Sequence, residues 1–361
     1  MSGPRGELKP LTAVRAVAAY AVVLFHFARG HHMPLLIERL VGAGYLAVSL
    51  FFVLSGFVLT HRYLDAPLAP RRFYVQRVAR LYPLYLVSLA VGFAATLPRS
   101  AAELSQPREQ LRVVLQVGVL NAFSHIAMFK WNWAAWSLSV EAFFYALFPL
   151  ALPRVRRTSP RVLVAVIVLA WALTFVVPSL YTAIDPDHLG HAPSPDDEVL
   201  YLWYARYFPL QRVPEFAAGC AAAALLHRVG WPSPRLARSL AWGGGATLLA
   251  IVGTAAVPYL FLHSGVLLPV FVALVVGLAA LPPATSVVTS PPVLALGHAS
   301  YATYILHVPL FLLMARLDPA LWGSLAHLPL YLAALVPLSL AGRRFVEEPL
   351  RRRMEGGARR S

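Results

Sequence analysis

The amino-acid sequence predicts an all-α, polytopic membrane protein with about ten transmembrane helices, and three observations lead to this prediction. Of the 361 residues, 58% are hydrophobic. Only 13% are charged, whereas a soluble globular domain carries about 25% charged residues. The chain also contains repeated apolar stretches of about 20 residues, which is the length that a helix needs to cross the hydrocarbon core of a bilayer.

Ten apolar windows lie between charged stretches or stretches rich in Pro and Gly, which commonly interrupt helices. We expect residues 1–341 to form one membrane-embedded domain and residues 342–361 to form a short basic cytoplasmic tail. In chain order, the predicted spans cover residues 11–29, 43–60, 82–98, 134–152, 162–181, 209–227, 239–258, 262–281, 293–315 and 322–341.

The distribution of basic residues predicts how these spans are oriented. If the N-terminus lies in the cytoplasm, most Lys and Arg residues fall on the inner side, whereas the outer segments contain similar numbers of basic and acidic residues. This pattern follows the positive-inside rule, so we expect both termini to be cytoplasmic and the protein to lie in the cell membrane. The formal net charge of +15 then reflects orientation. Since the sequence contains no nucleic-acid-binding motif, we expect no nucleic-acid partner.

Residues 109–130 are apolar for most of their length but do not fit this scheme. Counting them as a span would place the basic cluster at 154–161 on the outer side, against the positive-inside rule. The segment also contains Gln116 and Asn121, whose side chains are costly against lipid and acceptable where protein or water covers them. We therefore expect a re-entrant or interfacial segment here.

The first predicted span carries two ionisable residues, Arg15 and His26. Such side chains are costly inside a membrane and are commonly retained for function. At about 100° per residue the two project from the same helical face, separated by about 16 Å along the axis. One helix could thus contact both ends of a long substrate. The alternatives are that Arg15 reaches the inner headgroups and that His26 is a hydrogen-bonded core histidine.

A basic cluster precedes the third span. Arg77 and Arg80 are expected at the inner surface, and Arg72 lies just upstream of them. Guanidinium groups make bidentate hydrogen bonds to phosphates, so the cluster suits a phosphate-rich ligand. Anionic lipid headgroups are the alternative partner.

The fourth span begins with the stretch WNWAAWSLSVEAFFY, which contains Glu141. We expect this carboxylate at a depth similar to that of His26, where it could orient the imidazole and stabilise its protonated form. The alternative is a hydrogen bond that clamps two helices together. Trp136 is a candidate for substrate contact, although Trp131, Trp133 and Trp136 are also typical of the aromatic belt at a membrane surface.

Two later spans contribute the remaining candidates for substrate binding. Glu215 in the sixth span lies three residues after Arg212, a spacing that favours a local ion pair. His307 in the ninth span is either the second polar wall of a cavity or a structural histidine. Tyr301 in the same span either contacts substrate or satisfies a hydrogen bond.

In this order along the chain, these motifs resemble the acyltransferase 3 family of integral membrane O-acyltransferases. The most specific element is the pair of Arg15 and His26 in a first span that ends in VLFH. Two departures from the family pattern are LKPLTAVR, where the family has LDGLR, and Ala142, where many members have a second glutamate. The further matching motifs are FFVLSGFVLT, RRFYVQRVARLYPLY, WSLSVEAFFY, RVPEFAAGC, SYATYILHVPL and RRFVEEPLRRR.

The resemblance implies transfer of an acyl group, commonly acetyl, from cytoplasmic acyl-CoA to a hydroxyl group of a carbohydrate or glycosylated acceptor. It implies that His26 is catalytic, that Arg15 is its essential companion, and that Arg77 and Arg80 bind coenzyme A. Acyl-CoA (acetyl-CoA) is then a co-substrate, and we expect no tightly bound cofactor. The single cysteine, Cys220, excludes a cysteine-based zinc cluster, and we expect no metal site.

The residues themselves fit this chemistry. An acceptor hydroxyl loses a proton as it attacks a thioester, and an imidazole is a suitable general base near neutral pH. His26 is our candidate for this base, while Arg15 could fix the donor or offset charge on the carbonyl oxygen. The alternative function is a proton-coupled transporter or flippase of a polar or lipid-linked solute, with His26 and Glu141 as a proton relay.

Overall fold

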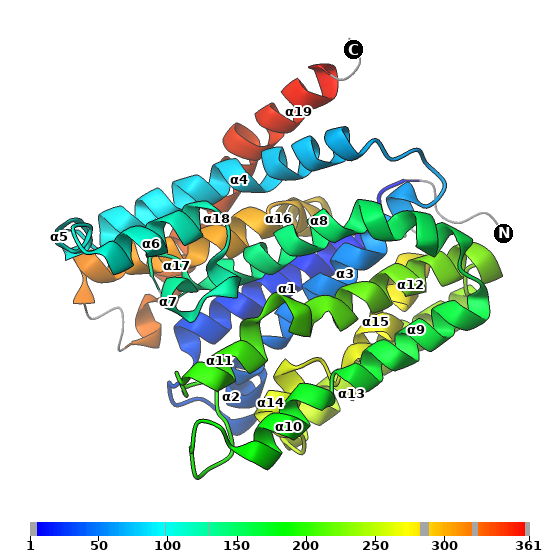
Figure 1. Ribbon diagram of the computed structural model, residues 1–361, viewed down its shortest axis with the longest axis horizontal. Coiled ribbons are helices and arrows are strands. Elements are labelled where there is room, and N and C mark those ends of the chain that lie inside the picture. Colours follow the sequence, from blue (N-terminus) through cyan, green and yellow to red (C-terminus); the bar gives the residue numbers. More distant parts are fainter. Residues whose placement is uncertain (1–5, 98, 129, 282–288, 320–323, 358–361) are drawn as a thin grey trace.

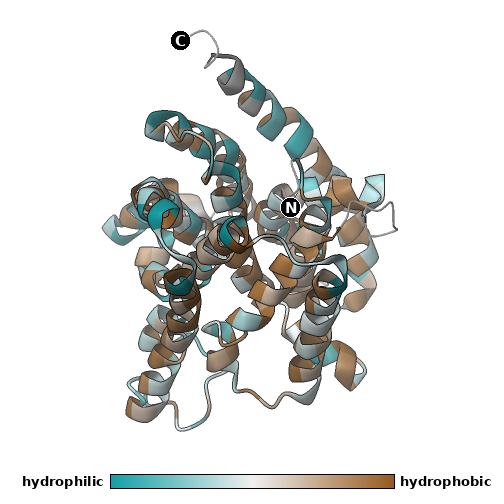
Figure 2. Ribbon diagram, turned by 90° about the vertical axis from the view of Figure 1, so that its right-hand side faces the viewer, coloured by the Kyte–Doolittle hydropathy of each residue, from teal (hydrophilic) through white to brown (hydrophobic). Residues whose placement is uncertain are grey.

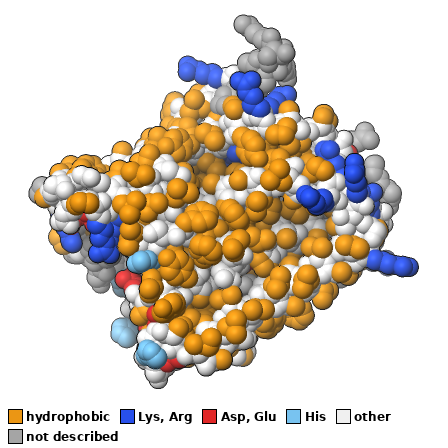
Figure 3. Space-filling model, viewed as in Figure 1, with side chains coloured by type: hydrophobic (Ala, Val, Ile, Leu, Met, Phe, Trp, Pro, Cys, Tyr) orange, Lys and Arg blue, Asp and Glu red, His pale blue; other side chains and the backbone are white. Residues whose placement is uncertain are grey.

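The computed structural model describes residues 6–97, 99–128, 130–281, 289–319 and 324–357. Every regular element within these ranges is a helix, so the predicted all-α class is confirmed. Nine helical segments of the described ranges are long and apolar enough to cross a membrane. Figure 3 shows hydrophobic side chains over most of one face of the molecule, with many of the Lys and Arg side chains near its upper and right margins. The protein is therefore a multi-pass membrane protein.

The helices lie side by side in one bundle (Figure 1). The α-helices are α1 (Lys9–Ala28), α2 (Leu35–Gly42), α3 (Leu46–Tyr63), α4 (Pro70–Ala95), α5 (Arg99–Glu103), α6 (Pro107–Val117), α7 (His125–Met128), α8 (Trp136–Arg157), α9 (Pro160–Leu173), α10 (Val176–Ile184), α11 (Leu200–Tyr207), α12 (Val213–Val229), α13 (Pro234–Thr254), α14 (Tyr259–His263), α15 (Leu268–Ala280), α16 (Pro291–His298), α17 (Ser300–Leu317), α18 (Leu328–Gly342) and α19 (Glu348–Gly357). The short 3-10 helices are η1 (Asn121–Phe123), η2 (Trp133–Ala135), η3 (Pro209–Arg212) and η6 (Leu325–His327), and η7 (Arg343–Glu347) is a π-helix.

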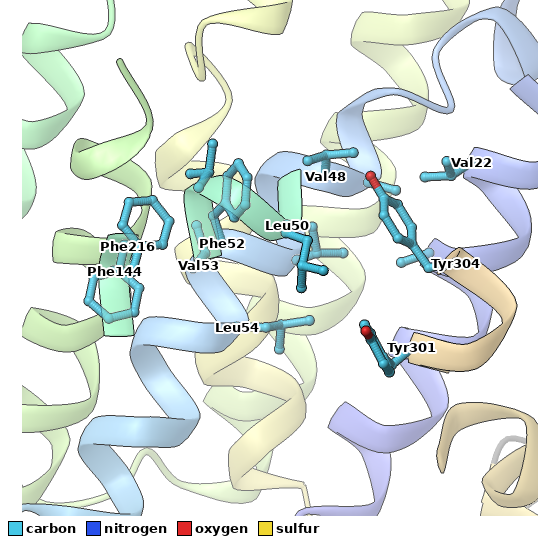
Figure 4. Close-up of a cluster of buried hydrophobic side chains, with 14 of the residues drawn as sticks. Val22, Val48, Leu50, Phe52, Val53, Leu54, Phe144, Phe216, Tyr301 and Tyr304 are labelled. Carbon is cyan, nitrogen blue, oxygen red and sulfur yellow. The ribbon is translucent and has the colours of Figure 1, made fainter. Parts of the chain in front are cut away.

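Helix α12, which corresponds to the sixth predicted span, packs tightly against α3 in the middle of the bundle. Its 17 residues make it shorter than each of the nine segments above. A Cβ added to Gly219 would lie 2.1 Å from the carbonyl oxygen of Val53, and one added to Gly56 would lie 2.1 Å from that of Phe216. Glycines on facing helices let the two backbones touch, as is common inside membranes. Figure 4 shows the ring of Phe216 stacked on that of Phe144 from α8, with the ring centroids 4.6 Å apart.

Helix α4 begins at Pro70, well before the predicted span at 82–98, so the predicted boundary is wrong. Proline is favoured in the first turn of a helix because its fixed φ suits that position. The arginines of the first turns lower the local hydropathy, so the apolar stretch covers only the later part of the helix. Helix formation turns Arg77 inward, where only 9% of its surface is exposed.

The predicted ninth span, 293–315, is divided into two helices, α16 and α17, which meet at Ala299. A Cβ added to Gly297 would lie 2.0 Å from the carbonyl oxygen of Thr12, so α16 packs directly on α1. Helix α17 also contacts α1. The division therefore places the first turn of α17 beside the half of α1 that carries Arg15.

The described residues of the segment 109–130 form no spanning helix, as the sequence predicts; the regular elements among them belong to α6, η1 and α7. Gln116 and Asn121 are each 1% exposed. The side-chain amide of Gln116 donates to the carbonyl oxygen of Ala127 at 2.7 Å. Protein therefore covers the polar side chains that would be costly against lipid.

The chain stays helical beyond α18. The π-helix η7 joins α18 to α19, and α19 packs against α4. Figure 2 shows the helix next to the C-terminus as mostly hydrophilic and projecting beyond the bundle. The described part of the predicted basic tail is thus a helix that follows directly from the last apolar segment.

Candidate active site

A cavity of about 110 Å³ lies between α1, α3, α4, α8 and α17. Its wall combines apolar side chains, mainly from α3, with an unusual number of polar ones from all five helices. This mixture is typical of a site for a small molecule, where polar groups fix the orientation of a ligand. The polar lining residues are Arg15, Ser55, Arg77, Arg80, Ser137, Glu141, Tyr145, Ser300, Tyr301 and Tyr304.

Three arginines face this cavity. Arg15 comes from α1, and Arg77 and Arg80 come from α4. The guanidinium of Arg77 lies over the rings of Phe73 and Tyr145, with 5.6 Å to each ring centroid. Its Nε has no hydrogen-bond partner among the described residues, although it is buried. Buried donors of this kind are costly unless they are satisfied, so the cavity is suited to an anionic ligand.

Arg72, the third arginine predicted to bind the donor, is exposed at the surface. It is five residues before Arg77, which corresponds to a rotation of about 140° around the helix axis. The structure therefore brings together Arg77, Arg80 and Arg15 and leaves Arg72 outside the cavity.

Glu141 is the acidic residue that lines the cavity, and two hydroxyl groups donate hydrogen bonds to its carboxylate. The hydroxyl of Tyr145 donates to its Oε1 through a short hydrogen bond. The hydroxyl of Ser55 donates to the same oxygen at 3.3 Å. With one carboxylate facing three guanidinium groups, the cavity keeps an excess of positive charge.

His26 lies in a second, much smaller hollow. This void of about 10 Å³ is lined by His26, His307 and Trp133 together with apolar and aromatic side chains. Nδ1 of His26 is 3.0 Å from Nε2 of His307. The volume is about that of one water-sized probe, so a sugar hydroxyl reaches His26 only if neighbouring groups move.

Tyr304 connects the two hollows. It lines the cavity, and its ring centroid is 5.8 Å from that of His307, one turn further along α17. Its hydroxyl is 2.7 Å from the hydroxyl of Ser137 and donates to the carbonyl oxygen of Ala134 at 3.0 Å. In Figure 4, Tyr301 and Tyr304 lie one above the other beside α3.

The expected contact between Glu141 and His26 is not formed, so this prediction is corrected. In the part of the chain that the structure describes, Glu141 bonds to Ser55 and Tyr145, whereas His26 bonds to His307. The physical reason is depth. His26 is two residues from the end of its helix and Glu141 is eight residues from the start of the segment at Trp133, which corresponds to about 3 Å and about 12 Å.

Three other predicted site residues lie at two different places. Tyr301 lines the cavity, and its hydroxyl donates to the carbonyl oxygen of Leu81. Glu215 is fully buried and forms the predicted ion pair with Arg212, 3.2 Å between the charged atoms. This pair lies beside Trp136, because the Arg212 guanidinium is 5.5 Å from the centroid of a Trp136 ring. Glu215 and Trp136 therefore belong to a buried network outside both hollows.

The membrane-belt interpretation is wrong for two of the three tryptophans. Trp131 and Trp136 are each 7% exposed and belong to the core of the bundle. Trp133 lines the hollow that contains His26. Neighbouring helices cover both rings, with Phe93 of α4 against Trp131 and Phe52 of α3 against Trp136.

Sequence reasoning missed Tyr145, which both holds Glu141 and packs on Arg77. Its spacing could have indicated this contact, since Tyr145 follows Glu141 by four residues and therefore lies on the same helical face. Ser55 of α3 provides a second hydroxyl donor to the same carboxylate. Among the described residues, no cluster of three or more His, Cys, Asp or Glu side chains is placed to hold a metal ion.

Comparison with known proteins supports one family. A family model described as an acyltransferase domain matches residues 9–344. Acyltransferase MdmB of Streptomyces mycarofaciens is 31% identical over 243 residues, which are 64% of this chain and 61% of that protein. A putative O-acetyltransferase of Staphylococcus aureus (strain COL) is 26% identical over 158 residues, 39% of this chain and 24% of that protein. No solved structure matches the chain.

This chain thus covers less than two thirds of the length of the Streptomyces relative. The match to the family itself, however, extends from the start of α1 to the π-helix after α18 and includes every residue that lines the two hollows. The protein therefore belongs to the acyltransferase 3 family.

Proposed function

We propose that this protein transfers an acyl group, with acetyl as the expected one, from acyl-CoA to a hydroxyl group of a carbohydrate or glycosylated acceptor, and that His26 is the general base. The observation that carries the proposal is the cavity in which Arg15, Arg77 and Arg80 surround one hollow next to the hollow of His26. Arginines bind phosphate and other anionic groups of a donor, and an imidazole accepts the proton of an alcohol.

The proposal includes an orientation in the cell membrane. Both termini are cytoplasmic, and α12 counts as a tenth span in the single domain at 1–341, with 342–361 as its basic tail. The Arg15 end of the bundle then faces the cytoplasm, where acyl-CoA is available as a co-substrate. The His26 end faces outward, where Arg29 pairs with Asp196 of the loop between α10 and α11 at 2.6 Å.

The donor enters the arginine cavity with its thioester end first. A volume of about 110 Å³ accommodates a narrow acyl and thiol arm, so the nucleotide remains at the cytoplasmic mouth. The unsatisfied Nε of Arg77 supplies a hydrogen bond to an anionic group of the donor. Acyl-CoA is not retained between turnovers and acts as substrate, with no tightly bound cofactor.

The separation of Arg15 and His26 decides between the two roles open to Arg15. The residues are about 16 Å apart along α1 at 1.5 Å per residue, and they face different hollows. An oxyanion that forms beside His26 is therefore out of reach of Arg15. We assign Arg15 to donor binding and leave the stabilisation of the oxyanion to groups near His26.

The reaction step is a single acyl transfer. The hydroxyl oxygen of the acceptor forms a bond to the thioester carbonyl carbon while its proton passes to His26, and the carbon–sulfur bond then breaks. The protonated His26 returns the proton to the coenzyme A thiolate, which leaves as the thiol. Because the hollow at His26 holds about 10 Å³, the acyl group and acceptor enter only when the bundle opens near Tyr304.

Replacement of His26 tests the proposal. Membranes that contain the wild-type protein are supplied with radiolabelled acetyl-CoA, and label is measured in envelope carbohydrate and in glycosylated small molecules. We expect His26→Ala to abolish transfer while the protein remains folded by gel filtration. His32→Ala is the matched control, since His32 is exposed outside the bundle, and it retains full transfer. Full transfer by His26→Ala would disprove the assigned base.

A related assay in reconstituted vesicles tests the alternative function, which is transport. Reconstituted vesicles that form a covalent acyl product without net movement of solute support the enzyme. Movement of solute without an acyl product would support a carrier instead, and family membership as an acyltransferase favours the first outcome.

A further inference from the structure

A second histidine lies beside the proposed base and is almost completely enclosed. His307 is 1% exposed and stands at the middle of α17. Its ring centroid is 5.0 Å from that of His26, with 31° between the ring planes. The two rings come from helices that are far apart in the chain, so their contact depends on the packing of α17 against α1.

The hydrogen bonds of His307 determine which nitrogen carries its proton. Nδ1 of His307 is 2.5 Å from the backbone carbonyl oxygen of Tyr304. A carbonyl oxygen only accepts hydrogen bonds, so Nδ1 must be the protonated nitrogen. In a neutral imidazole the other nitrogen is then an acceptor. Nε2 of His307 therefore offers a lone pair to its neighbour.

That neighbour is Nδ1 of His26 at 3.0 Å. Since Nε2 of His307 accepts, Nδ1 of His26 must donate and must carry the proton of the neutral ring. Nε2 of His26 is then the nitrogen with the lone pair. A chain of two hydrogen bonds thus runs from His26 through His307 to the carbonyl oxygen of Tyr304.

We propose that His307 is a positioning residue that holds His26 in the tautomer with the proton on Nδ1, so that Nε2 of His26 receives the proton of the acceptor hydroxyl. This inference deepens the proposed function and depends on it, because it assigns a role relative to His26 as the base. The part that the sequence suggested for Glu141 is thereby taken by an imidazole from a different helix.

The surroundings of His307 keep this geometry in place. The hydroxyl of Tyr331 donates to the backbone carbonyl oxygen of His307 at 2.7 Å. Tyr331 is itself 1% exposed, and its ring stacks on that of Phe27, with 4.9 Å between the centroids. Because Phe27 is adjacent to His26, the same packing fixes the helices that carry both imidazoles.

The same hydrogen bond also stabilises the imidazolium form of His26 that arises when it takes the proton. When Nε2 of His26 takes the proton, the ring becomes an imidazolium, whose Nδ1–H is a stronger donor than that of the neutral ring. The bond to Nε2 of His307 then becomes charge-assisted. His307 therefore selects the reactive nitrogen before proton transfer and stabilises the positive charge afterwards, as outer partners of catalytic histidines do.

The experiment compares two replacements of His307. His307→Leu retains bulk and removes the acceptor, whereas the side-chain amide of His307→Gln can again accept from His26 and donate to the carbonyl oxygen. In the radiolabelled acetyl-transfer assay we expect His307→Leu to lower kcat by about 10- to 100-fold, with an unchanged KM for acetyl-CoA. We expect His307→Gln to recover a large part of the lost rate.

A spectroscopic measurement separates positioning from packing and needs no acceptor. The ¹⁵N chemical shifts of histidine-labelled protein, assigned with His26→Ala, report which ring nitrogen carries the proton. We expect Nδ1–H at His26 in the wild-type protein and in His307→Gln, and a mixture of tautomers in His307→Leu. An Nε2–H tautomer at His26 in the wild-type protein would overturn the proposal even if a variant failed to fold.

The controls distinguish this proposal from the proposed function. Full transfer by His26→Ala would disprove the function itself. An inactive His26→Ala together with a folded His307→Leu of wild-type kcat would refute only the role of His307. Equal loss of kcat in His307→Leu and His307→Gln, with both proteins folded and His26 unchanged in its tautomer, would likewise refute it.

Discussion

The side chain of Arg77 illustrates how one residue gains a role from its surroundings. Its side chain is buried, its guanidinium lies over two neighbouring aromatic rings, and its Nε has no hydrogen-bond partner among the described residues. Arg72, on the same helix and of the same type, is exposed. The pair therefore allows a comparison in which residue type is constant and only position changes.

Replacement of these two arginines tests donor binding. A hydrogen bond to a charged group contributes about 1.5–3 kcal/mol, which corresponds to about 10- to 100-fold in Kd. We expect Arg77→Ala to raise the Kd for coenzyme A by this factor and Arg72→Ala to leave it unchanged, as measured by titration calorimetry of the purified protein. Equal effects of the two replacements would contradict a donor site in the cavity and favour general attraction to the basic surface.

Glu141 offers a second comparison at this scale. Both hydroxyl donors, from Ser55 and Tyr145, reach the same oxygen, and an amide oxygen can accept both bonds. Glu141→Gln therefore keeps the geometry and removes a negative charge from a cavity with three arginines. In the wild-type protein the carboxylate of Glu141 competes with an anionic ligand for the arginines. If this competition costs about 1 kcal/mol, Glu141→Gln binds coenzyme A about fivefold more tightly, which the same calorimetric titration measures.

The kinetics of the same variant test its distance from His26. Since the structure bonds Glu141 to other partners, we expect the pH profile of kcat to be the same in Glu141→Gln and the wild-type protein. A shifted profile would show that Glu141 acts on the base and would restore the interpretation that the sequence alone suggested.

At the scale of elements, the contact between α3 and α12 organises the bundle. Gly56 and Gly219 bring the two backbones together, and both helices are buried along most of their length. The cavity takes much of its apolar wall from α3. The shape of the site therefore depends on a contact between glycines that lie outside it.

A methyl group at Gly219 tests this contact. It would lie 2.1 Å from the carbonyl oxygen of Val53, and overpacking of this kind costs about 1–3 kcal/mol. We expect Gly219→Ala to lower the Tm in detergent. Gly243→Ala is the matched control, since no atom lies within 4 Å of the added Cβ. That replacement is expected to raise the Tm slightly through better helix propensity. A Tm for Gly219→Ala at or above that of the control would contradict the tight packing.

At the scale of the whole molecule, the proposed orientation has a direct test. Cys220 is buried inside α12, with 7% of its surface exposed, so it reacts little with an impermeant maleimide. We expect Ala192→Cys, at an exposed position in the loop between α10 and α11, to be labelled on intact cells. Arg235→Cys, which is also at an exposed position, is expected to react only after the cells are broken. The reverse labelling would invert the orientation and place the arginine cavity outside.

The predictions from sequence succeed where a local rule governs the outcome. The all-α class, most of the spans and the ion pair of Glu215 with Arg212 follow from hydropathy and helical spacing. The start of α4 and the burial of Trp131 were predicted incorrectly. Both depend on neighbouring helices. They provide the polar cavity that Arg77 of α4 faces, and they cover the ring of Trp131.

The sequence by itself determined that this chain is helical, that it crosses a membrane repeatedly, and that Arg15 and His26 share one face of one helix. Hydropathy and a fixed helical rotation are sufficient for these conclusions because they depend on residues within one segment. Only the tertiary structure decided that Glu141 meets Tyr145 and Ser55, and that His26 meets His307, 281 positions away in the chain. Contacts between helices depend on their depth and packing, which no single segment specifies.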